Sequence, residues 1–179
     1  MELVIYMKRP YYGDILGANN GVIAYANRGY KDFKLDSNEV YGVYTGFKYQ
    51  CVEYARRWLV ISKNLTFPEV LIATDIWGVP FLTDISTNQE VPLTPIPNNS
   101  PTRPKIGDLL VYQNGSKLPW GHVAVIVNIK NQESIQIAEQ NEIDHFWTGD
   151  FSRELKLTYS ENYKILDKYP IIGWMTYNR

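Results

Sequence analysis

The sequence predicts an α+β fold, and two observations lead to this class. Helical patterns lie mainly in the first half of the chain, and strand patterns lie mainly after residue 108. The connections between the later strands are short and polar, which favours antiparallel pairing. Helices that precede strands are typical of α+β proteins, so we expect an antiparallel sheet packed against N-terminal helices. A length of 179 residues suffices for a single domain, 1–179, with a sizeable core.

The first expected element is a helix over residues 51–62. Val52, Ala55 and Leu59 recur there at helical spacing, with good helix formers between them. A second helix is expected over 69–77. These two segments would supply the helices that cover the sheet.

The second half of the chain shows five runs rich in Val, Ile, Leu and Tyr, which are residues typical of strands. The expected strands are 108–113, 122–129, 134–139, 154–159 and 171–177. Residues 91–108 come before them and contain five of the ten prolines, so they cannot form a long helix or a central strand. We interpret this stretch as a surface loop within one domain rather than as a linker between two.

Composition excludes several classes of protein. Hydrophobic residues make up 45% of the chain and aromatic residues 14%, as in globular proteins. Eighteen basic residues against nineteen acidic ones give no basic excess that would indicate a nucleic-acid partner. No apolar run approaches the roughly 18 residues of a membrane span, and the N-terminal run is too short for a signal peptide. We therefore expect a cytoplasmic protein with no membrane partner.

Cys51 is the only cysteine, so the chain has no internal disulfide. A lone cysteine on a helix is usually a small buried hydrophobe. Cys51, however, falls at the expected first turn of its helix, shortly after Gly46. The free N–H groups and the dipole of a helix N-terminus lower the pKa of a cysteine and can hold the oxyanion of an acyl-transfer intermediate. Cys51 is therefore a candidate nucleophile.

A thiol nucleophile needs a base, and the chain has two histidines. His145 lies in the polar stretch NEIDHFWTGD and is interpreted as a surface histidine. His122 follows Gly121 and begins a nearly unbroken apolar run, which is typical of a strand buried on both faces. The first residue of such a strand lies at the rim of the sheet, where a site can open. A core histidine bonded to the backbone is the alternative for His122.

Glu139 is the candidate for the third member of the site. In a strand it shares a face with Ile135 and Ile137, and a carboxylate on an apolar face is costly unless it is paired. A two-residue hairpin loop at 130–131 places His122 directly opposite Glu139, and a loop at 131–132 places Glu139 on the diagonal. A three-residue loop would break this relation. If the relation holds, Glu139 can orient the imidazole, as the acid of a catalytic triad does.

Cys51, His122 and Glu139 together suit acyl transfer through a thioester. A zinc site is the competing interpretation, because cysteine, histidine and carboxylate side chains can all bind zinc. The sequence has no C-x-x-C, H-x-x-x-H or H-E-x-x-H pattern. We therefore expect no metal and no cofactor.

These residues lie in motifs that resemble a known family. YQCVEYARRWL, GHVAVIV, QIAEQN and the closing IIGWM are similar to the amidase domain of the glutathionylspermidine synthetase/amidase family. That domain belongs to the CHAP group (cysteine, histidine-dependent amidohydrolase/peptidase) of the papain-like NlpC/P60 class. GDILGANNGVIAYAN and PIPNNSPTRPKIGDLLVY also resemble it, so the likeness spans about residues 13–176.

The resemblance implies a papain-like fold with Cys51 as nucleophile, His122 as general base and Glu139 as orienting acid. It also implies residues that bind substrate. Arg56 and Asn141 fall where the family contacts the glutathionyl part of its substrate, and Gln50 is a candidate polar group near the oxyanion. Without the resemblance, Arg56 could be an ordinary exposed helix arginine.

The implied function is hydrolysis of an amide such as glutathionylspermidine or a related glutathionyl–polyamine conjugate. Two alternatives remain: a peptidase or amidase acting on peptidoglycan or another peptide amide, and a catalytically inactive binding domain. The family's ligase domain has no counterpart in these 179 residues, so we expect hydrolysis and not synthesis. Tyr49 stands where the family usually has tryptophan, which bears on substrate detail more than on chemistry.

Overall fold

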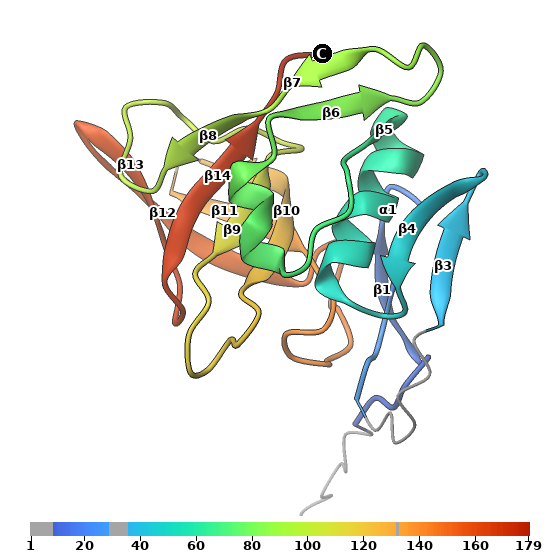
Figure 1. Ribbon diagram of the computed structural model, residues 1–179. Helices are drawn as coiled ribbons and strands as arrows, with labels where there is room; N and C mark the ends of the chain where they lie inside the picture. The colour runs from blue at the N-terminus through green and yellow to red at the C-terminus, as the bar shows by residue number, and fades with distance from the viewer. Residues whose placement is uncertain (1–8, 29–35, 132) are drawn as a thin grey trace, which may run out of the picture.

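The computed structural model describes residues 9–28, 36–131 and 133–179 (Figure 1). The short N-terminal apolar run that argues against a signal peptide falls within residues 1–8, which lie outside the described residues. The main element is a seven-stranded antiparallel sheet with the strand order β13-β12-β11-β10-β9-β14-β8. Its strands are β8 (Thr94–Pro97), β9 (Leu109–Tyr112), β10 (His122–Lys130), β11 (Ser134–Ala138), β12 (Arg153–Ser160), β13 (Asn162–Leu166) and β14 (Ile171–Thr176).

All five strands expected from the sequence are present in this sheet. Two further strands, β8 and β13, were not expected. The proline-rich stretch 91–108 is therefore not entirely a loop. β8 lies at the edge of the sheet, where a strand can tolerate prolines that donate no hydrogen bond.

The expectation of several helices ahead of the sheet is corrected by the structure. α1 (Cys51–Lys63) is the one α-helix in the described residues, and the expected helix at 69–77 is only the short 3₁₀-helix η1 (Ala73–Gly78). Strands precede α1 instead: β1 (Ile15–Asn19), β2 (Val22–Tyr25), β3 (Ser37–Val40) and β4 (Val43–Phe47) form two hairpins. The described chain is mainly antiparallel strand, so the α+β class itself is not confirmed.

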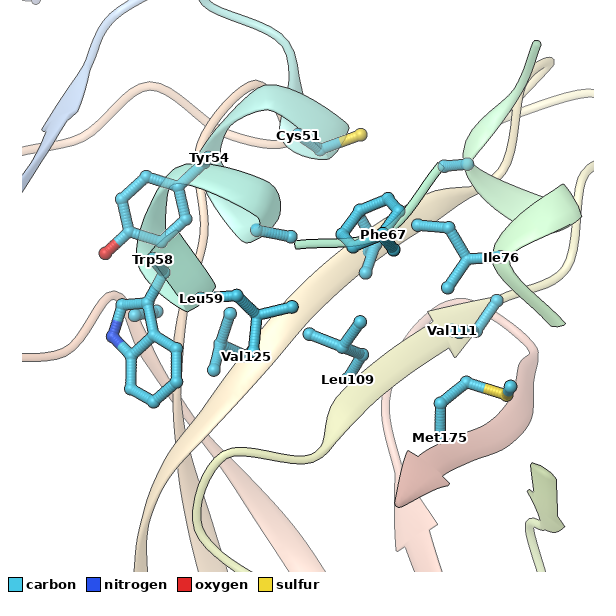
Figure 2. Close-up of a cluster of buried hydrophobic side chains, with 14 of the residues drawn as sticks. Cys51, Tyr54, Trp58, Leu59, Phe67, Ile76, Leu109, Val111, Val125 and Met175 are labelled. Atoms are coloured by element: carbon cyan, nitrogen blue, oxygen red, sulfur yellow. The ribbon is translucent and has the colours of Figure 1, made fainter. Parts of the chain in front are cut away.

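Helix α1 lies between the large sheet and the β3–β4 hairpin (Figure 1). Its inner side chains, among them Trp58 and Leu59, pack with Leu109 and Val125 of the sheet, as Figure 2 shows. The helix ends at Asn64, which adopts the left-handed conformation (φ 55°) and donates its N–H to the carbonyls of the last turn. A small sheet of β5 (Leu65–Thr66), β6 (Phe81–Asp84) and β7 (Glu90–Pro92) follows α1.

Strand β9 and the first five residues of β10 are buried on both faces. Leu109 and Val125 belong to the core cluster on the side of α1, whereas Leu110 and Ala124 belong to a second cluster across the sheet. The burial predicted from the apolar run is therefore present at the start of β10, whereas the strand becomes partly exposed from Val127 on. A rigid, doubly covered strand is a firm support for its first residue, His122.

Candidate active site

Cys51 is the first residue of α1, preceded by Gln50 in extended conformation (φ −80°, ψ 158°). Figure 2 shows its sulfur at the first turn of the helix, directed away from Tyr54 and Trp58. Burial by itself raises the pKa of the Cys51 thiol. The charge and hydrogen bond of His122 and the backbone N–H groups of Val123 and Val52 outweigh burial, so the pKa is lowered. The surroundings therefore favour a thiolate.

His122 and Glu139 are both buried, and 2.8 Å separates His122 Nε2 from Glu139 Oε2. With Nε2 on Glu139, Nδ1 is the ring nitrogen left to bond Cys51, and that bond and the Cys51 charge raise the pKa of His122. Although burial lowers the pKa of His122, these contacts and Glu139 together raise it to about 10. Burial raises the pKa of Glu139, but His122 and Arg153 bring it down to about 2. The imidazolium and the carboxylate therefore stabilise each other.

The loop of the hairpin that joins His122 to Glu139 differs from both expected loops. Lys130 pairs with Ser134, so three residues connect β10 and β11, and one of them, residue 132, lies outside the described residues. By itself this connection would place His122 and Glu139 on different faces. A bulge between Ile126 and Asn128 adds one residue to β10 and restores the register of the expected 131–132 loop.

A cleft of about 380 Å³ opens beside Cys51. Its lining is largely apolar and aromatic and includes Tyr44, Phe47, Leu71 and Trp120. Leu71 is 97% exposed and Trp120 67% exposed, so large apolar side chains are available to a ligand at its lip. A larger cleft lies at the other end of α1 and is lined by none of the candidate residues.

Arg56 lines the same cleft, but its guanidinium is bound by the protein itself. Nη1 donates to the Thr45 carbonyl (2.7 Å), Nε to Phe67 (3.0 Å) and Nη2 to Pro68 (3.0 Å). Arg56 is therefore a buried residue of the cleft wall and not an exposed helix arginine.

Asn141 and Gln50 lie together at the rim of the site. Asn141 Nδ2 donates to Gln50 Oε1 at 2.7 Å, and the Asn141 backbone has a positive φ of 60°. Gln50 also lines the cleft. Tyr49, where the family usually has tryptophan, stacks on Tyr25 with ring centroids 4.6 Å apart.

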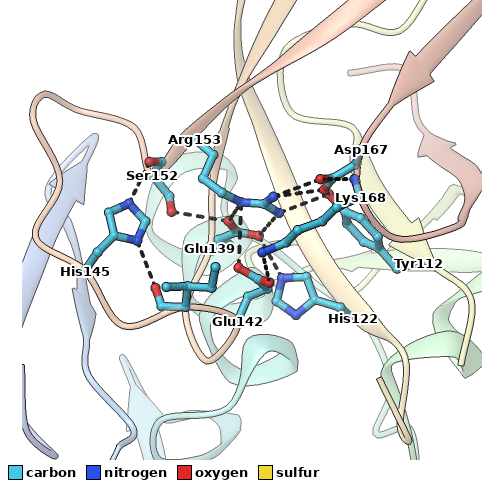
Figure 3. A network of polar contacts seen from close by, with 10 residues as sticks. Tyr112, His122, Glu139, Glu142, His145, Ser152, Arg153, Asp167 and Lys168 are labelled. Atoms are coloured by element: carbon cyan, nitrogen blue, oxygen red, sulfur yellow. Dashed lines mark hydrogen bonds and ion pairs between the residues drawn. The ribbon is translucent and has the colours of Figure 1, made fainter. Parts of the chain in front are cut away.

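Sequence reasoning missed Arg153, the first residue of β12, which bonds Glu139 (Figure 3). No motif marked it, because the loop between β11 and β12 is too long for the sequence to fix their register. His145 lies in this loop, and its two ring nitrogens face the carbonyls of Ile143 and Ser152. It contacts neither Cys51 nor His122.

Within residues 9–28, 36–131 and 133–179, no group of three or more His, Cys, Asp or Glu side chains is arranged to hold a metal ion. The same residues contain no helix that is long and apolar enough to cross a membrane.

Comparisons with known proteins identify the family of this chain. The model of the CHAP domain matches residues 42–141, which is more than half of the chain. The chain therefore belongs to the CHAP family, whose fold is papain-like, and the resemblance inferred from the sequence is confirmed.

Three curated relatives extend the match. A trypanothione synthetase of Crithidia fasciculata is 33% identical over 94% of this chain and 27% of its own length. The bifunctional glutathionylspermidine synthetase/amidase of Escherichia coli is 32% identical over 92% of this chain and 29% of its own length. A glutathionylspermidine synthase of Crithidia fasciculata is 33% identical over 73% and 19%. The chain spans less than a third of the length of these relatives, and the family and the relatives together support a CHAP-type amidohydrolase.

Proposed function

We propose that this protein hydrolyses an amide bond through a thioester on Cys51. The observation that carries the proposal is the continuous chain of contacts from the Cys51 thiol to His122 and on to Glu139, with the cysteine at the wall of a cleft. A thiolate–imidazolium pair backed by a buried carboxylate is suited to nucleophilic attack on a carbonyl.

In the first half of the reaction, the Cys51 thiolate attacks the carbonyl carbon of the amide. The N–H groups at the start of α1, with the Gln50 side chain near them, hold the oxyanion of the tetrahedral intermediate. His122 then gives its proton to the leaving amine, and the C–N bond breaks to leave a thioester on Cys51.

In the second half, neutral His122 takes a proton from water while the water oxygen attacks the thioester carbonyl. The C–S bond breaks, the carboxylic acid leaves, and the thiolate–imidazolium pair is restored. Glu139 keeps Nε2 of His122 bonded throughout, so Nδ1 faces the reacting atoms in both steps.

The substrate that we propose is glutathionylspermidine or a related glutathionyl–polyamine conjugate. The relatives support this choice, since one of them is a glutathionylspermidine synthetase/amidase. Arg56 in the cleft wall, and Asn141 with Gln50 at its rim, are proposed to bind the glutathionyl half.

The test is incubation of the purified protein with glutathionylspermidine, followed by mass spectrometry. We expect release of spermidine and glutathione, and loss of this activity in Cys51→Ala and His122→Gln. His145→Gln is the matched histidine control and should retain activity, because His145 contacts neither Cys51 nor His122. Chelator treatment should have no effect.

Other outcomes would change the proposal. Cleavage of muropeptides without turnover of glutathionylspermidine would move the substrate to a peptide amide. Full activity of Cys51→Ala would remove the thiol from the mechanism. No turnover of either substrate would favour a binding domain that lacks catalysis.

A further inference from the structure

Glu139 contacts His122 with only part of its carboxylate, and Arg153 and Ser152 hold the rest (Figure 3). Arg153 Nε donates to Oε1 at 2.6 Å, and Nη2 donates to Oε2 at 3.2 Å. The Ser152 hydroxyl donates to Oε1 at 3.2 Å. A planar guanidinium that binds both oxygens of a carboxylate fixes its orientation and also keeps it ionised.

Arg153 is itself held in place from its other side. Nη1 donates to both carboxylate oxygens of Asp167, at 3.0 and 3.1 Å, and Nη2 lies 3.3 Å from the Tyr112 hydroxyl. Tyr112 donates to Asp167 at 2.7 Å and pairs with His122 across β9 and β10. Arg153 thus joins the catalytic pair to β9 and to the connection between β13 and β14.

The carboxylates around Arg153 outnumber the other cations. Three carboxylates face it: Glu139, Asp167 and Glu142, whose Oε2 lies 3.9 Å from Arg153 Nε. The other cations of this cluster are the His122 imidazolium, bonded to Glu139, and Lys168, whose Nζ lies 2.9 Å from Glu142 Oε1. Without Arg153, three nearly buried carboxylates would share one lysine and the His122 imidazolium, and a cluster with an excess of buried carboxylates tends to take up a proton.

We propose that Arg153 is a positioning residue of the active site, which keeps Glu139 ionised and turned toward His122. This inference rests on the proposed function. Arg153 does not line the cleft beside Cys51, so it acts through Glu139 and not on the substrate. Asp167 and Tyr112 bond the Arg153 guanidinium and hold it in the position in which it binds Glu139.

The experiment measures the rate of Cys51 alkylation by iodoacetamide as a function of pH, together with kcat and KM, in Arg153→Met. We expect the midpoint of the alkylation profile to rise by about one pH unit or more, because both the arginine charge and the ionised Glu139 favour the thiolate. We expect kcat to fall about 10- to 100-fold, as for other residues that orient a catalytic ligand, with little change in KM.

Three further variants separate positioning from stability. Arg153→Met/Asp167→Asn restores the charge balance, so it should regain thermal stability while kcat stays low. Arg153→Lys keeps the charge but cannot span both carboxylates, so its alkylation midpoint should lie near that of wild type and its kcat below it. Arg179→Met removes a similar arginine–aspartate pair, with Asp84 at 2.7 Å, and should leave both readouts unchanged.

Two results would overturn the inference. One is a wild-type alkylation profile and kcat in Arg153→Met. The other is full recovery of kcat in Arg153→Met/Asp167→Asn, which would make Arg153 a purely structural partner of Asp167. Alkylation needs no substrate, so a failure of the proposed amidase function, seen as a wild-type protein without turnover, is distinguishable from a failure of this inference.

Discussion

The Cys51 thiol is buried, and burial alone would keep it neutral. Three groups from two elements reverse this: the N–H of Val52 in α1, the N–H of Val123 in β10, and the His122 ring. The His122 proton in turn depends on Glu139. The thiolate is therefore stabilised directly by His122 and the two N–H groups, and indirectly by Glu139 through His122.

Replacing Glu139 with glutamine tests this dependence. Glutamine keeps the shape and can still hydrogen-bond the ring, but it cannot offset the charge of His122. We expect kcat to fall about 10- to 1,000-fold, which is less than the roughly 10⁴-fold of serine enzymes because a thiol needs less help from its base. Binding of an uncleaved substrate analogue should barely change.

The matched control is Glu154→Gln. Glu154 lies in β12 of the same sheet and bonds Ser134, Gln136 and Lys130, and Lys130 is at the opposite end of β10 from His122. It should keep the kcat of the wild type. A wild-type kcat with an unshifted pH profile in Glu139→Gln would remove Glu139 from the site.

The pair of Glu139 and His122 also predicts how stability depends on pH. The pKa of Glu139 is lowered from 4.5 to about 2, so its contribution is present above pH 4.5 and is lost as the pH falls through 2. The pKa of His122 is raised from 6.5 to about 10, so its contribution is complete below pH 6.5 and is lost as the pH rises through 10.

The free energy of unfolding should therefore differ most between wild type and Glu139→Gln from pH 4.5 to 6.5. Urea denaturation across the pH range measures this difference. It should shrink toward both ends of the range. A difference that is constant with pH, or largest in alkali, would contradict the assignment of charges to this pair.

At the scale of elements, β10 and β11 show what a sequence can predict. Their positions follow from their composition, and the shared face of Glu139 and Ile137 follows from strand alternation. The three-residue connection and the compensating bulge near Val127 do not. Bulges have no strong sequence signature within an apolar run. The predicted contact between His122 and Glu139 is therefore present, but the loop that was predicted to produce it is wrong.

The hairpins before α1 were missed for a different reason. Asn20-Gly21 and Tyr41-Gly42 have the positive φ values of tight hairpin turns, and Asn-Gly is a strong hairpin signal that was available in the sequence. The strands beside these turns are short and mixed in polarity. Their pairing depends on contacts with α1, which a local pattern does not reveal.

Gly121 tests how the start of β10 positions His122. Its φ is +67°, and a Cβ there would lie 2.0 Å from Thr74 Oγ1 and 2.9 Å from the Tyr112 carbonyl. Gly121→Ala should therefore push η1 away from β10 and lower the free energy of unfolding by about 1–3 kcal/mol. It should also lower kcat, because His122 follows Gly121 directly. Thermal denaturation and steady-state kinetics measure the two effects.

Gly115→Ala is the control in the same connection, because a Cβ there meets no atom within 4 Å. It should leave stability and kcat close to wild type. Gly121→Ala/Thr74→Ala should recover part of the lost stability, since the nearest clashing atom is gone. An unaffected Gly121→Ala variant would mean that η1 can move without disturbing His122.

At the scale of the whole molecule, Arg56 and Arg57 of α1 form hydrogen bonds that connect the helix to other elements. Arg57 pairs with Glu53 and donates to the Ile23 carbonyl of β2. Arg56 donates to Thr45 of β4 and to the segment after β5. The partners of Arg56 are backbone carbonyls, which carry no side-chain signal, so the sequence marked Arg56 without showing what it binds.

Arg56→Ala decides between two roles for this residue. If Arg56 builds the cleft wall, its loss leaves the carbonyls of Thr45, Phe67 and Pro68 without their donor. Each unsatisfied buried group costs about 1–3 kcal/mol, so the free energy of unfolding should fall by about 2–4 kcal/mol after relaxation. The cleft should loosen, and KM should rise about 10- to 100-fold, by more than kcat falls.

Urea denaturation measures the change in stability, and steady-state kinetics measure the change in KM, with the exposed Arg103→Ala as control. A raised KM at unchanged stability would instead assign Arg56 to direct contact with the substrate, whereas wild-type values of both would exclude either role.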